Sequence, residues 1–298
     1  MPAFVILNPY ANRWSALKQR PEAEKALTEA GVEFELQISQ APGDAVEIAR
    51  HAAVEGYSPI IAAGGDGTIG EVVNGLYRAN DRSTLGPFGV LPLGTANDLI
   101  HNLGLPLDLP GAAAAIANGH TRRIDLGKVN DWVFCNNSAI GLEPVVTLHN
   151  IHMKRTKGIV RYLLAALKAI AENHRWDMKI EWDDGEYEGP ISLVSVGNCP
   201  LTGGMFHMAP DADPADGRLT FVRGYAPTRR RMLALLPRTI TGSYIHQQGI
   251  SQHHTRCLRI QSHQPSPLQV DGELRTEADT HFKYEVLQSR LDILVPGA

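Results

Sequence analysis

Hydrophobic positions in the first 128 residues alternate between short apolar runs, which predict buried strands, and longer stretches with helical spacing. Glycine follows several of these segments and marks where they end. The predicted strands are 4–7, 32–38, 59–63 and 86–91, and the predicted helices are 15–30, 43–56, 68–79 and 95–103. Because strands that alternate with helices form parallel sheets covered by helices, this half predicts an α/β domain.

From about residue 121 the pattern changes to short β-rich segments, which favour a β-sandwich or a barrel. The predicted strands are 122–129, 132–139, 178–182, 191–197, 219–222, 258–262 and 268–270, and the predicted helices are 158–173 and 229–241. We therefore expect two domains, 1–126 and 127–287. The last predicted strand, 291–295, could return to either domain, so the first domain could also include the segment 288–298.

Composition narrows the class of protein. The chain has 298 residues with 43% hydrophobic and 20% charged residues, which is typical of a soluble globular protein. The apolar segment 159–171 contains Arg161 and Lys168, so it falls short of the ~20 apolar residues that cross a membrane. No signal peptide is apparent, and Cys135, Cys199 and Cys257 form neither a disulfide framework nor a metal knuckle. These features predict a cytoplasmic protein.

Charge is unevenly distributed around the net value of −4. Residues 217–270 contain no acidic residue but eight arginines, and the segment between Glu143 and Glu172 is also basic. Candidate contacts for lipid headgroups, and so for a peripheral anionic membrane surface, are Lys154, Arg155, Lys157, Arg229, Arg230 and Arg231. Nucleic acid is not expected as a partner, because the chain shows no recognition-helix motif and no interleaved aromatic residues.

Helix 158–173 carries an apolar stripe of Ile159, Leu163, Leu167 and Ile170. A basic amphipathic helix can lie on an anionic membrane, but we favour a stripe that faces the protein core.

The segment Gly64-Gly65-Asp66-Gly67-Thr68 lies between a predicted strand and a predicted helix. Glycines let the backbone approach a ligand closely, and the N–H groups at a helix start bind phosphate. An aspartate there would orient a hydroxyl group, take a proton or hold a cation. The alternative is a glycine-rich turn in which Asp66 only caps the helix.

Two further segments also follow predicted strands, Leu91–Leu99 and Asn8–Asn12. Ligands bind at the carboxyl ends of the strands in open α/β sheets, so these loops could converge on one nucleotide pocket.

Five ordered motifs resemble the bacterial diacylglycerol kinase and lipid kinase family, relatives of sphingosine and ceramide kinases. They are NPYAN at 8–12, GGDGT at 64–68, LPLGTANDL at 91–99, VSVGNCPLTGG with APDADPADG at 194–217, and VDGE at 270–273. The resemblance covers nearly the whole chain. It implies an ATP-dependent phosphoryl transfer to a lipid hydroxyl group, on an α/β nucleotide-binding domain followed by a β-sandwich domain. It also suggests a homodimer.

The resemblance assigns roles to individual residues. Glu273 matches the proton acceptor for the lipid hydroxyl, and Asp66 has a catalytic role beside magnesium. Asp216 matches a structural Mg²⁺ ligand, together with the backbone carbonyls of Asp213 and Arg218; Asp98 and Asp125 are weaker metal candidates. The residues that match ATP-binding positions are Asn8, Pro9, Tyr10, Ala11, Asn12, Ser39, Gly64, Gly65, Asp66, Gly67, Thr68, Ile69, Gly70 and Thr95.

Two positions depart from the family pattern. Asn12 replaces a usual glycine, and Gly141-Leu142-Glu143 replaces a Gly-Phe-Asp pattern, which suggests an altered acceptor pocket. Glu273 follows the acid-free segment, so we expect positive potential near it, which would favour its ionised, proton-accepting form. The alternative to this chemical role is that Asp271-Gly272-Glu273 is only a hairpin turn.

Other functions fit less well. An NAD kinase shares GGDGT, but Gly197-Asn198-Cys199-Pro200 lacks the expected Asn-Glu pair. A catalytically silent nucleotide- or lipid-binding regulator stays open as a second alternative. The twelve histidines lack zinc-site spacing, and no GxSxG motif indicates a serine hydrolase.

Overall fold

The computed structural model describes residues 1–153 and 158–297. The chain divides into two compact units: unit 1 comprises 1–126 and 288–298, and unit 2 comprises 127–287. It passes between them within strands β5 (Thr121–Val129) and β16 (Glu273–Leu294).

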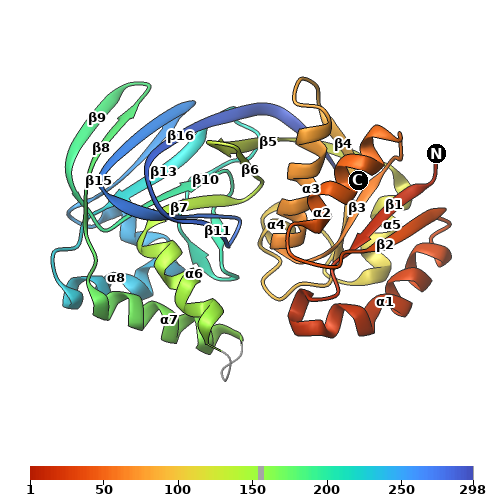
Figure 1. Cartoon of the computed structure of the whole chain (residues 1–298), viewed down its shortest axis with the longest axis horizontal. Helices are drawn as coiled ribbons and strands as arrows, with labels where there is room; N and C mark the ends of the chain where they lie inside the picture. Colours follow the sequence, from red (N-terminus) through yellow and green to blue (C-terminus); the bar gives the residue numbers. More distant parts are fainter. Residues whose placement is uncertain (154–157, 298) are drawn as a thin grey trace. The chain divides into compact units, whose positions relative to one another are not determined.

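Unit 1 is built on a parallel sheet in the order β2-β1-β3-β4-β16, with only the last residues of β16 contributing (Figure 1). All five residues of β1 and of β3 are buried, as expected for central strands covered on both faces. Helices α1 and α5 pack on one face, and α2 and α3 pack on the other. The elements are β1 (Ala3–Leu7), α1 (Ala11–Glu29), β2 (Phe34–Ile38), α2 (Asp44–Val54), β3 (Ile60–Gly64), α3 (Asp66–Ala79), β4 (Leu85–Pro92), α4 (Asp98–Leu103) and α5 (Leu109–Asn118).

The predicted rhythm of unit 1 is confirmed, with differences at helix ends. The helix expected from Thr95 begins only at Asp98, because Asn97 has a left-handed backbone with φ of 52° that cannot continue a helix. Helix α5 was not predicted. Its start is fixed by Asp108, whose side chain accepts the Gly111 N–H at 2.8 Å.

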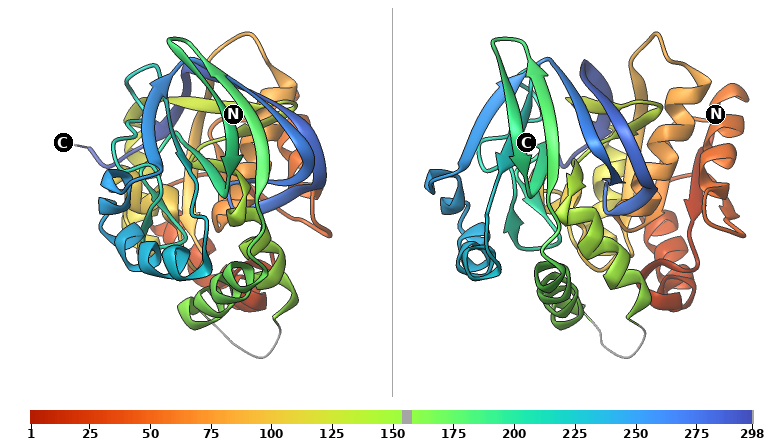
Figure 2. Two further views of the ribbon diagram at one scale, coloured as in Figure 1. Left: turned by 90° about the vertical axis from the view of Figure 1, so that its left-hand side faces the viewer. Right: turned by 60° about the vertical axis from the view of Figure 1, so that its left-hand side comes forward.

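Unit 2 contains two antiparallel layers that share β15 (Cys257–Val270). The first half of β15 pairs with β8, and its second half pairs with β7. The pairing of β15 with β16 shifts register from Gln261 onward. The first layer continues from β8 to β9, and the second from β7 through β10 and β13 to β14. Figure 2 shows the long β8–β9 hairpin from two further sides. The apolar core between the layers includes Phe134, Met178, Val196, Phe221, Ile260 and Phe282. The β-sandwich expectation is therefore confirmed.

The remaining elements of unit 2 are β6 (Trp132–Phe134), β7 (Asn137–Gly141), α6 (Leu142–His152), α7 (Gly158–Glu172), β8 (Trp176–Trp182), β9 (Gly185–Ile191), β10 (Leu193–Gly197), β11 (Leu201–Thr202), β12 (Phe206–His207), β13 (Leu219–Gly224), α8 (Arg229–Ile240), the 3-10 helix η1 (Ser243–His246) and β14 (Ile250–Thr255). The prediction of one continuous strand at 132–139 was wrong. The segment breaks between β6 and β7 because the N–H groups of Cys135 and Asn136 turn to the Asp271 carboxylate.

Helix α7 packs against α6 and α8 (Figures 1 and 2). The predicted core-facing stripe was partly wrong, because Leu167 is 45% exposed. Alanines supply most of the buried face instead, and large apolar residues lie outside: Ala165, Ala166, Ala169 and Ile170 are buried, whereas Val160, Leu164 and Leu167 are exposed. In the described part of the chain, no helix is both long and apolar enough to cross a membrane. The basic residues Lys154, Arg155 and Lys157 lie outside the described residues.

Candidate active site

Three loops of unit 1 are tied together where their strands end. The Asn8 amide, after β1, donates to Thr68 Oγ1 in α3 at 3.0 Å. The Thr95 hydroxyl, after β4, donates to Asn12 Oδ1 in α1 at 3.2 Å. The structure thus brings together the three segments that the sequence places at one sheet edge.

Glycine is required where two of these loops meet. A Cβ atom on Gly94 would overlap Gly65 Cα and the side chain of Asn97, and a Cβ atom on Gly64 would overlap the Thr68 side chain. The Leu93 N–H also donates to Gly64 O at 3.0 Å. The β3–α3 and β4–α4 loops therefore touch backbone to backbone, with no room for side chains between them.

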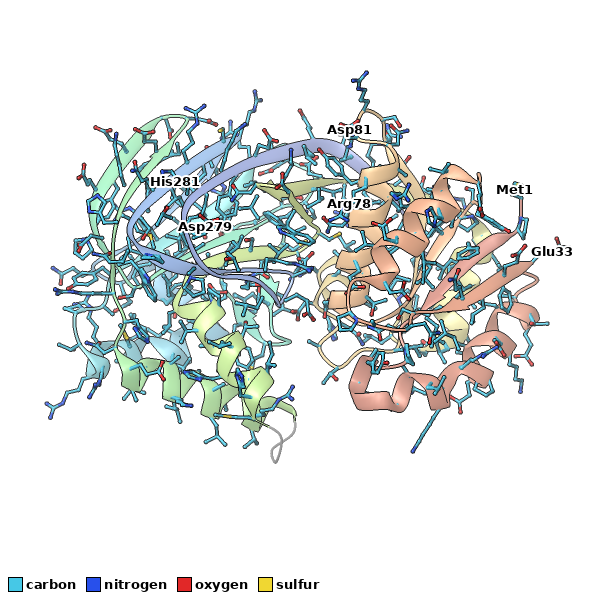
Figure 3. All side chains as sticks on the ribbon, in the orientation of Figure 1. Met1, Glu33, Arg78, Asp81, Asp279 and His281 are labelled. Atoms are coloured by element: carbon cyan, nitrogen blue, oxygen red, sulfur yellow. The ribbon has the colours of Figure 1, made fainter. Side chains whose placement is uncertain are left out.

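Helix α3 begins at Asp66 and has no side-chain cap at Gly65. Its helix dipole places positive partial charge at this end, and Arg78 complements the opposite end from the last turn (Figure 3). A helix start beside a glycine-rich loop is a general phosphate site. Ile69 and Gly70 are buried in α3, so they can serve such a site only through their backbone positions.

Asp66 is neither a bare turn residue nor a cap of its own helix. Its Oδ1 accepts the Leu99 N–H at 3.2 Å, so the carboxylate holds the first turn of α4. Burial raises the pKa of Asp66, and the backbone N–H groups of Leu99 and Asp98 oppose that effect. Asp98 is itself buried in the same first turn. Two buried acidic residues therefore begin the two helices that follow the touching loops, Asp66 in α3 and Asp98 in α4.

Asp125 lies in β5 and is 1% exposed. Its Oδ1 accepts the N–H of Ser289 at 2.6 Å, and Ser289 has a left-handed backbone with φ of 50°. This contact anchors β16 where it enters unit 1. It gives Asp125 a structural role that sequence reasoning missed.

The remaining ATP-binding candidates lie at the same strand ends. Ser39 is buried directly after β2, and its N–H donates to Leu7 O at 3.0 Å. The Tyr10 hydroxyl donates to Gln40 O at 2.9 Å, which connects the β1–α1 and β2–α2 loops. Pro9 is buried between Asn8 and Tyr10, Ala11 opens α1, and Gly67 lies in the first turn of α3.

In unit 2, Glu273 is the exposed first residue of β16 and pairs with Val270 across a two-residue turn. Asp271 and Gly272 form that turn with φ of 47° and 79°. An Asp-Gly pair with positive φ at both positions is the usual two-residue hairpin turn. The hairpin alternative is therefore correct as geometry, and it does not exclude a chemical role for Glu273.

Asp271 holds this turn in place. Its carboxylate accepts three backbone N–H groups, those of Cys135, Asn136 and Asn137, at 2.9, 2.9 and 3.0 Å. The Asp271 N–H in turn donates to Asn137 O at 2.8 Å. Sequence reasoning missed this role, although an aspartate opening a tight turn beside a candidate base was a visible signal.

The positive potential expected near Glu273 stays a prediction. Arg223 lies over the Tyr187 ring, 3.9 Å from its centroid, and Arg231 donates to the Gln248 carbonyl. These arginine contacts stabilise unit 2 and do not test the potential.

The Asp213–Arg218 loop is a tight turn rich in oxygen atoms. Asp213 Oδ1 accepts the Ala215 N–H at 3.0 Å, and Asp216 Oδ1 accepts the Arg218 N–H at 2.9 Å. The Asp213 carbonyl accepts the Asp216 N–H over a long distance of 3.4 Å. One carboxylate and two carbonyl oxygens suit magnesium in kind. Within the described residues, no cluster of three or more His, Cys, Asp or Glu side chains could hold a metal ion.

Comparisons with known proteins match both units. Residues 2–129 match the model of the diacylglycerol kinase catalytic domain, and residues 137–295 match that of the YegS C-terminal NAD kinase beta sandwich-like domain. A diacylglycerol kinase from Staphylococcus aureus (strain MRSA252) is 29% identical over 296 residues, which cover 99% of this chain and 92% of the relative.

Solved structures share the fold. A crystal structure of a candidate diacylglycerol kinase from Bacillus anthracis str. Sterne aligns with a TM-score of 0.80 and 23% identity, covering 99% of this chain and 95% of that one. Yeast NADH kinase complexed with NADH aligns with a TM-score of 0.50 and 11% identity, covering 100% of this chain and 84% of that one.

Proposed function

Because the chain belongs to the diacylglycerol kinase family, with the catalytic domain of that family followed by a YegS C-terminal domain, we propose that it transfers the γ-phosphoryl group of ATP to a lipid hydroxyl group. Diacylglycerol is the default acceptor. The observation that carries the proposal is the backbone contact of Gly65 and Gly94 at the start of α3. Loops that approach so closely expose N–H groups rather than side chains, as phosphate binding requires.

ATP binds to unit 1 in this proposal. The β3–α3 loop and the first turn of α3, Gly64 to Gly70, hold the phosphate groups through backbone N–H donors. Asn8, Asn12 and Thr95 keep the neighbouring loops in register through the hydrogen bonds described above. Asn12 has φ of 47°, so it adopts the left-handed conformation that the family's usual glycine adopts without strain. That conformation explains how asparagine can replace glycine here.

As the oxygen of the lipid hydroxyl group attacks the γ-phosphorus, Glu273 accepts the proton of that hydroxyl group. Its exposed position next to a fixed turn suits this task, because a base must be reachable and held in place. Asp271 acts as a positioning residue, since its bonds to three backbone N–H groups fix the turn that presents Glu273.

We propose two places for magnesium. Asp216, with the carbonyl groups of Asp213 and Arg218, would hold a structural ion in unit 2. Asp66 and Asp98 would hold the ion that accompanies ATP. The weaker candidate Asp125 is not assigned to it, because the described residues contain no three-residue cluster of this kind and Asp125 Oδ1 accepts the Ser289 N–H. Bound there, Mg²⁺ neutralises charge on the phosphate groups. Asp66 additionally positions α4 through the Leu99 N–H.

Contact with an anionic membrane would bring the enzyme to its substrate. Arg229 and Arg230 are exposed at the start of α8, and Leu164, Leu167 and Leu233 are exposed on α7 and α8. Basic and apolar side chains together suit the cytoplasmic face of a membrane. A homodimer is part of the proposal only through the family resemblance.

Transfer of labelled γ-phosphate tests the proposal. The protein is incubated with ATP, magnesium and a panel of lipid alcohols in detergent micelles, with NAD as a parallel acceptor. Labelled lipid is the expected product. Labelled NADP would instead identify an NAD kinase, and nucleotide binding without turnover on any acceptor would identify a silent regulator.

A further inference from the structure

Arg275 lies two residues after Glu273 in β16, at a break in the pairing with β15. The register shifts by one residue between Leu274 and Thr276, so Arg275 has no residue opposite it. An extra residue of this kind is a β-bulge, which redirects a side chain and is frequent beside active sites. Because a strand rises about 3.3 Å per residue, the Cα atoms of Glu273 and Arg275 lie within about 7 Å of each other.

The Trp132 ring holds the Arg275 side chain. The guanidinium carbon Cζ of Arg275 lies over this ring, 4.2 Å from its centroid, which is the geometry of a cation–π contact. Trp132 is the first residue of β6, and the three N–H groups that bind Asp271 follow shortly after it. Glu273 therefore lies between two contacts to the segment 132–137, one through Asp271 and one through Arg275.

Packing on Trp132 does not explain why this side chain carries a charge. Among the side chains that the structure describes, Arg275 takes part in no ion pair. Its Nε atom is buried without a hydrogen-bond partner among the described residues. A methionine would cover the same ring without the cost of taking a cation out of water. A negatively charged ligand beside Glu273 would offset that cost.

Phosphoryl transfer supplies such a ligand. Negative charge is spread over the oxygen atoms of the transferred group, and fixed cations stabilise it. The guanidinium group of arginine suits these oxygen atoms because its N–H groups form a planar fork.

We propose that Arg275 contacts the oxygen atoms of the phosphoryl group while Glu273 takes the proton of the acceptor hydroxyl group. The inference rests on the proposed function, which supplies both the phosphoryl group and the role of Glu273. In this arrangement one short segment, held by Asp271 at its turn and by Trp132 at its bulge, carries the base and a cation together.

Two substitutions of Arg275 separate its charge from its packing. Arg275→Met still covers the Trp132 ring but has no charge, whereas Arg275→Lys keeps a cation. We expect Arg275→Met to lower the rate of phosphoryl transfer about 100-fold with an unchanged affinity for MgATP, and Arg275→Lys to lower it less than tenfold. Arg259→Met removes the same charge from an exposed position of β15 and should leave the rate unchanged. An unchanged rate in Arg275→Met, or equal losses in Arg275→Met and Arg275→Lys, would overturn the proposal.

Trp132→Leu tests how the cation is held. This variant keeps the charge of Arg275 but removes the ring below it, so we expect about a tenfold loss of rate. Added to Arg275→Met, it should cause no further loss, because the ring acts through the arginine. Independent losses that multiply in the double variant would contradict the arrangement.

Urea unfolding shows whether these variants fold. If Arg275→Met does not fold, the binding of inorganic phosphate to the unsubstituted protein decides. The amide NMR signals of residues 273–276 should shift when phosphate is added, and unchanged signals there would overturn the proposal.

The transfer and binding assays distinguish the two proposals. If the unsubstituted protein phosphorylates no acceptor, the proposed function fails, and phosphate-induced shifts at 273–276 that Arg275→Met abolishes would still support the anion contact. Lipid phosphorylation at equal rates by Arg275→Met and the unsubstituted protein would refute the role of Arg275 and leave the proposed function intact.

Discussion

Replacing Glu143 by glutamine should change how the stability of unit 2 depends on pH. In the folded protein, burial raises the pKa of Glu143 from 4.5 to about 7. Between these values the unfolded chain releases the proton more readily than the folded one. The unsubstituted protein therefore loses stability as the pH rises from about 4.5 to about 7, and the loss levels off above that range. Glutamine carries no titrating proton, so this loss disappears in the variant.

The size of the effect follows from the pKa values. One pKa unit corresponds to about 1.4 kcal/mol, so between pH 5 and pH 8 the loss amounts to about 2–3 kcal/mol. Other groups titrate equally in both proteins. The stability of Glu143→Gln relative to the unsubstituted protein should therefore increase by that amount from pH 5 to pH 8.

Urea unfolding followed by tryptophan fluorescence measures this difference. Three of the four tryptophans, Trp132, Trp176 and Trp182, lie in unit 2, so the signal reports mainly on that unit. Glu186→Gln, an exposed change in β9, is the matched control and should give a profile parallel to that of the unsubstituted protein. Parallel profiles for Glu143→Gln would show that the Glu143 carboxyl group is not desolvated, and would refute the reasoning.

Three further substitutions test candidate residues within each unit. Asp271→Asn should destabilise unit 2 by about 2 kcal/mol in the same urea assay, because a neutral amide replaces a carboxylate that accepts three N–H groups. An unchanged free energy of unfolding would contradict the positioning role of Asp271. Gly94→Ala should weaken ATP binding about tenfold or more by calorimetry, since its Cβ would push against Gly65; unchanged binding would show that the loop contact is not needed. Thr68→Val should raise the KM for ATP a few-fold, because it removes the hydrogen bond from Asn8. Thr68→Ser keeps the hydroxyl group and is the control. Equal KM values in the two variants would show that this hydrogen bond does not contribute to nucleotide binding.

Much of unit 1 could be predicted because local signals agree with the fold. Short apolar runs followed by helical spacing predicted the alternation of strands and helices apart from α5, and the strand ends placed three loops at one edge. The start of α4 was missed because helical spacing continues through Asn97 and does not show its left-handed backbone. The alternative in which Asp66 only caps α3 was wrong, because its carboxylate holds α4 through Leu99, a partner 33 positions away in the sequence.

Unit 2 was harder because its important contacts join distant segments. The break between β6 and β7 depends on the Asp271 carboxylate, more than 130 residues away. The apolar stripe of α7 was misplaced since the helix is apolar on several sides, and periodicity does not show that alanines face inward. The departure at Glu143 was visible in the sequence, but the burial that raises its pKa arises only when α6, α7, α8 and the sheet pack together.

Single-turnover transfer to diacylglycerol by Glu273→Gln tests the central claim most directly. The variant and the unsubstituted protein are each saturated with MgATP, whose affinity is measured separately, and labelled lipid is followed with time. We expect an unchanged affinity for ATP and a transfer rate reduced about 100-fold or more, as for loss of a general base. Equal transfer rates in the two proteins would contradict the assignment of Glu273, and absence of labelled lipid from the unsubstituted protein would contradict the lipid kinase function itself.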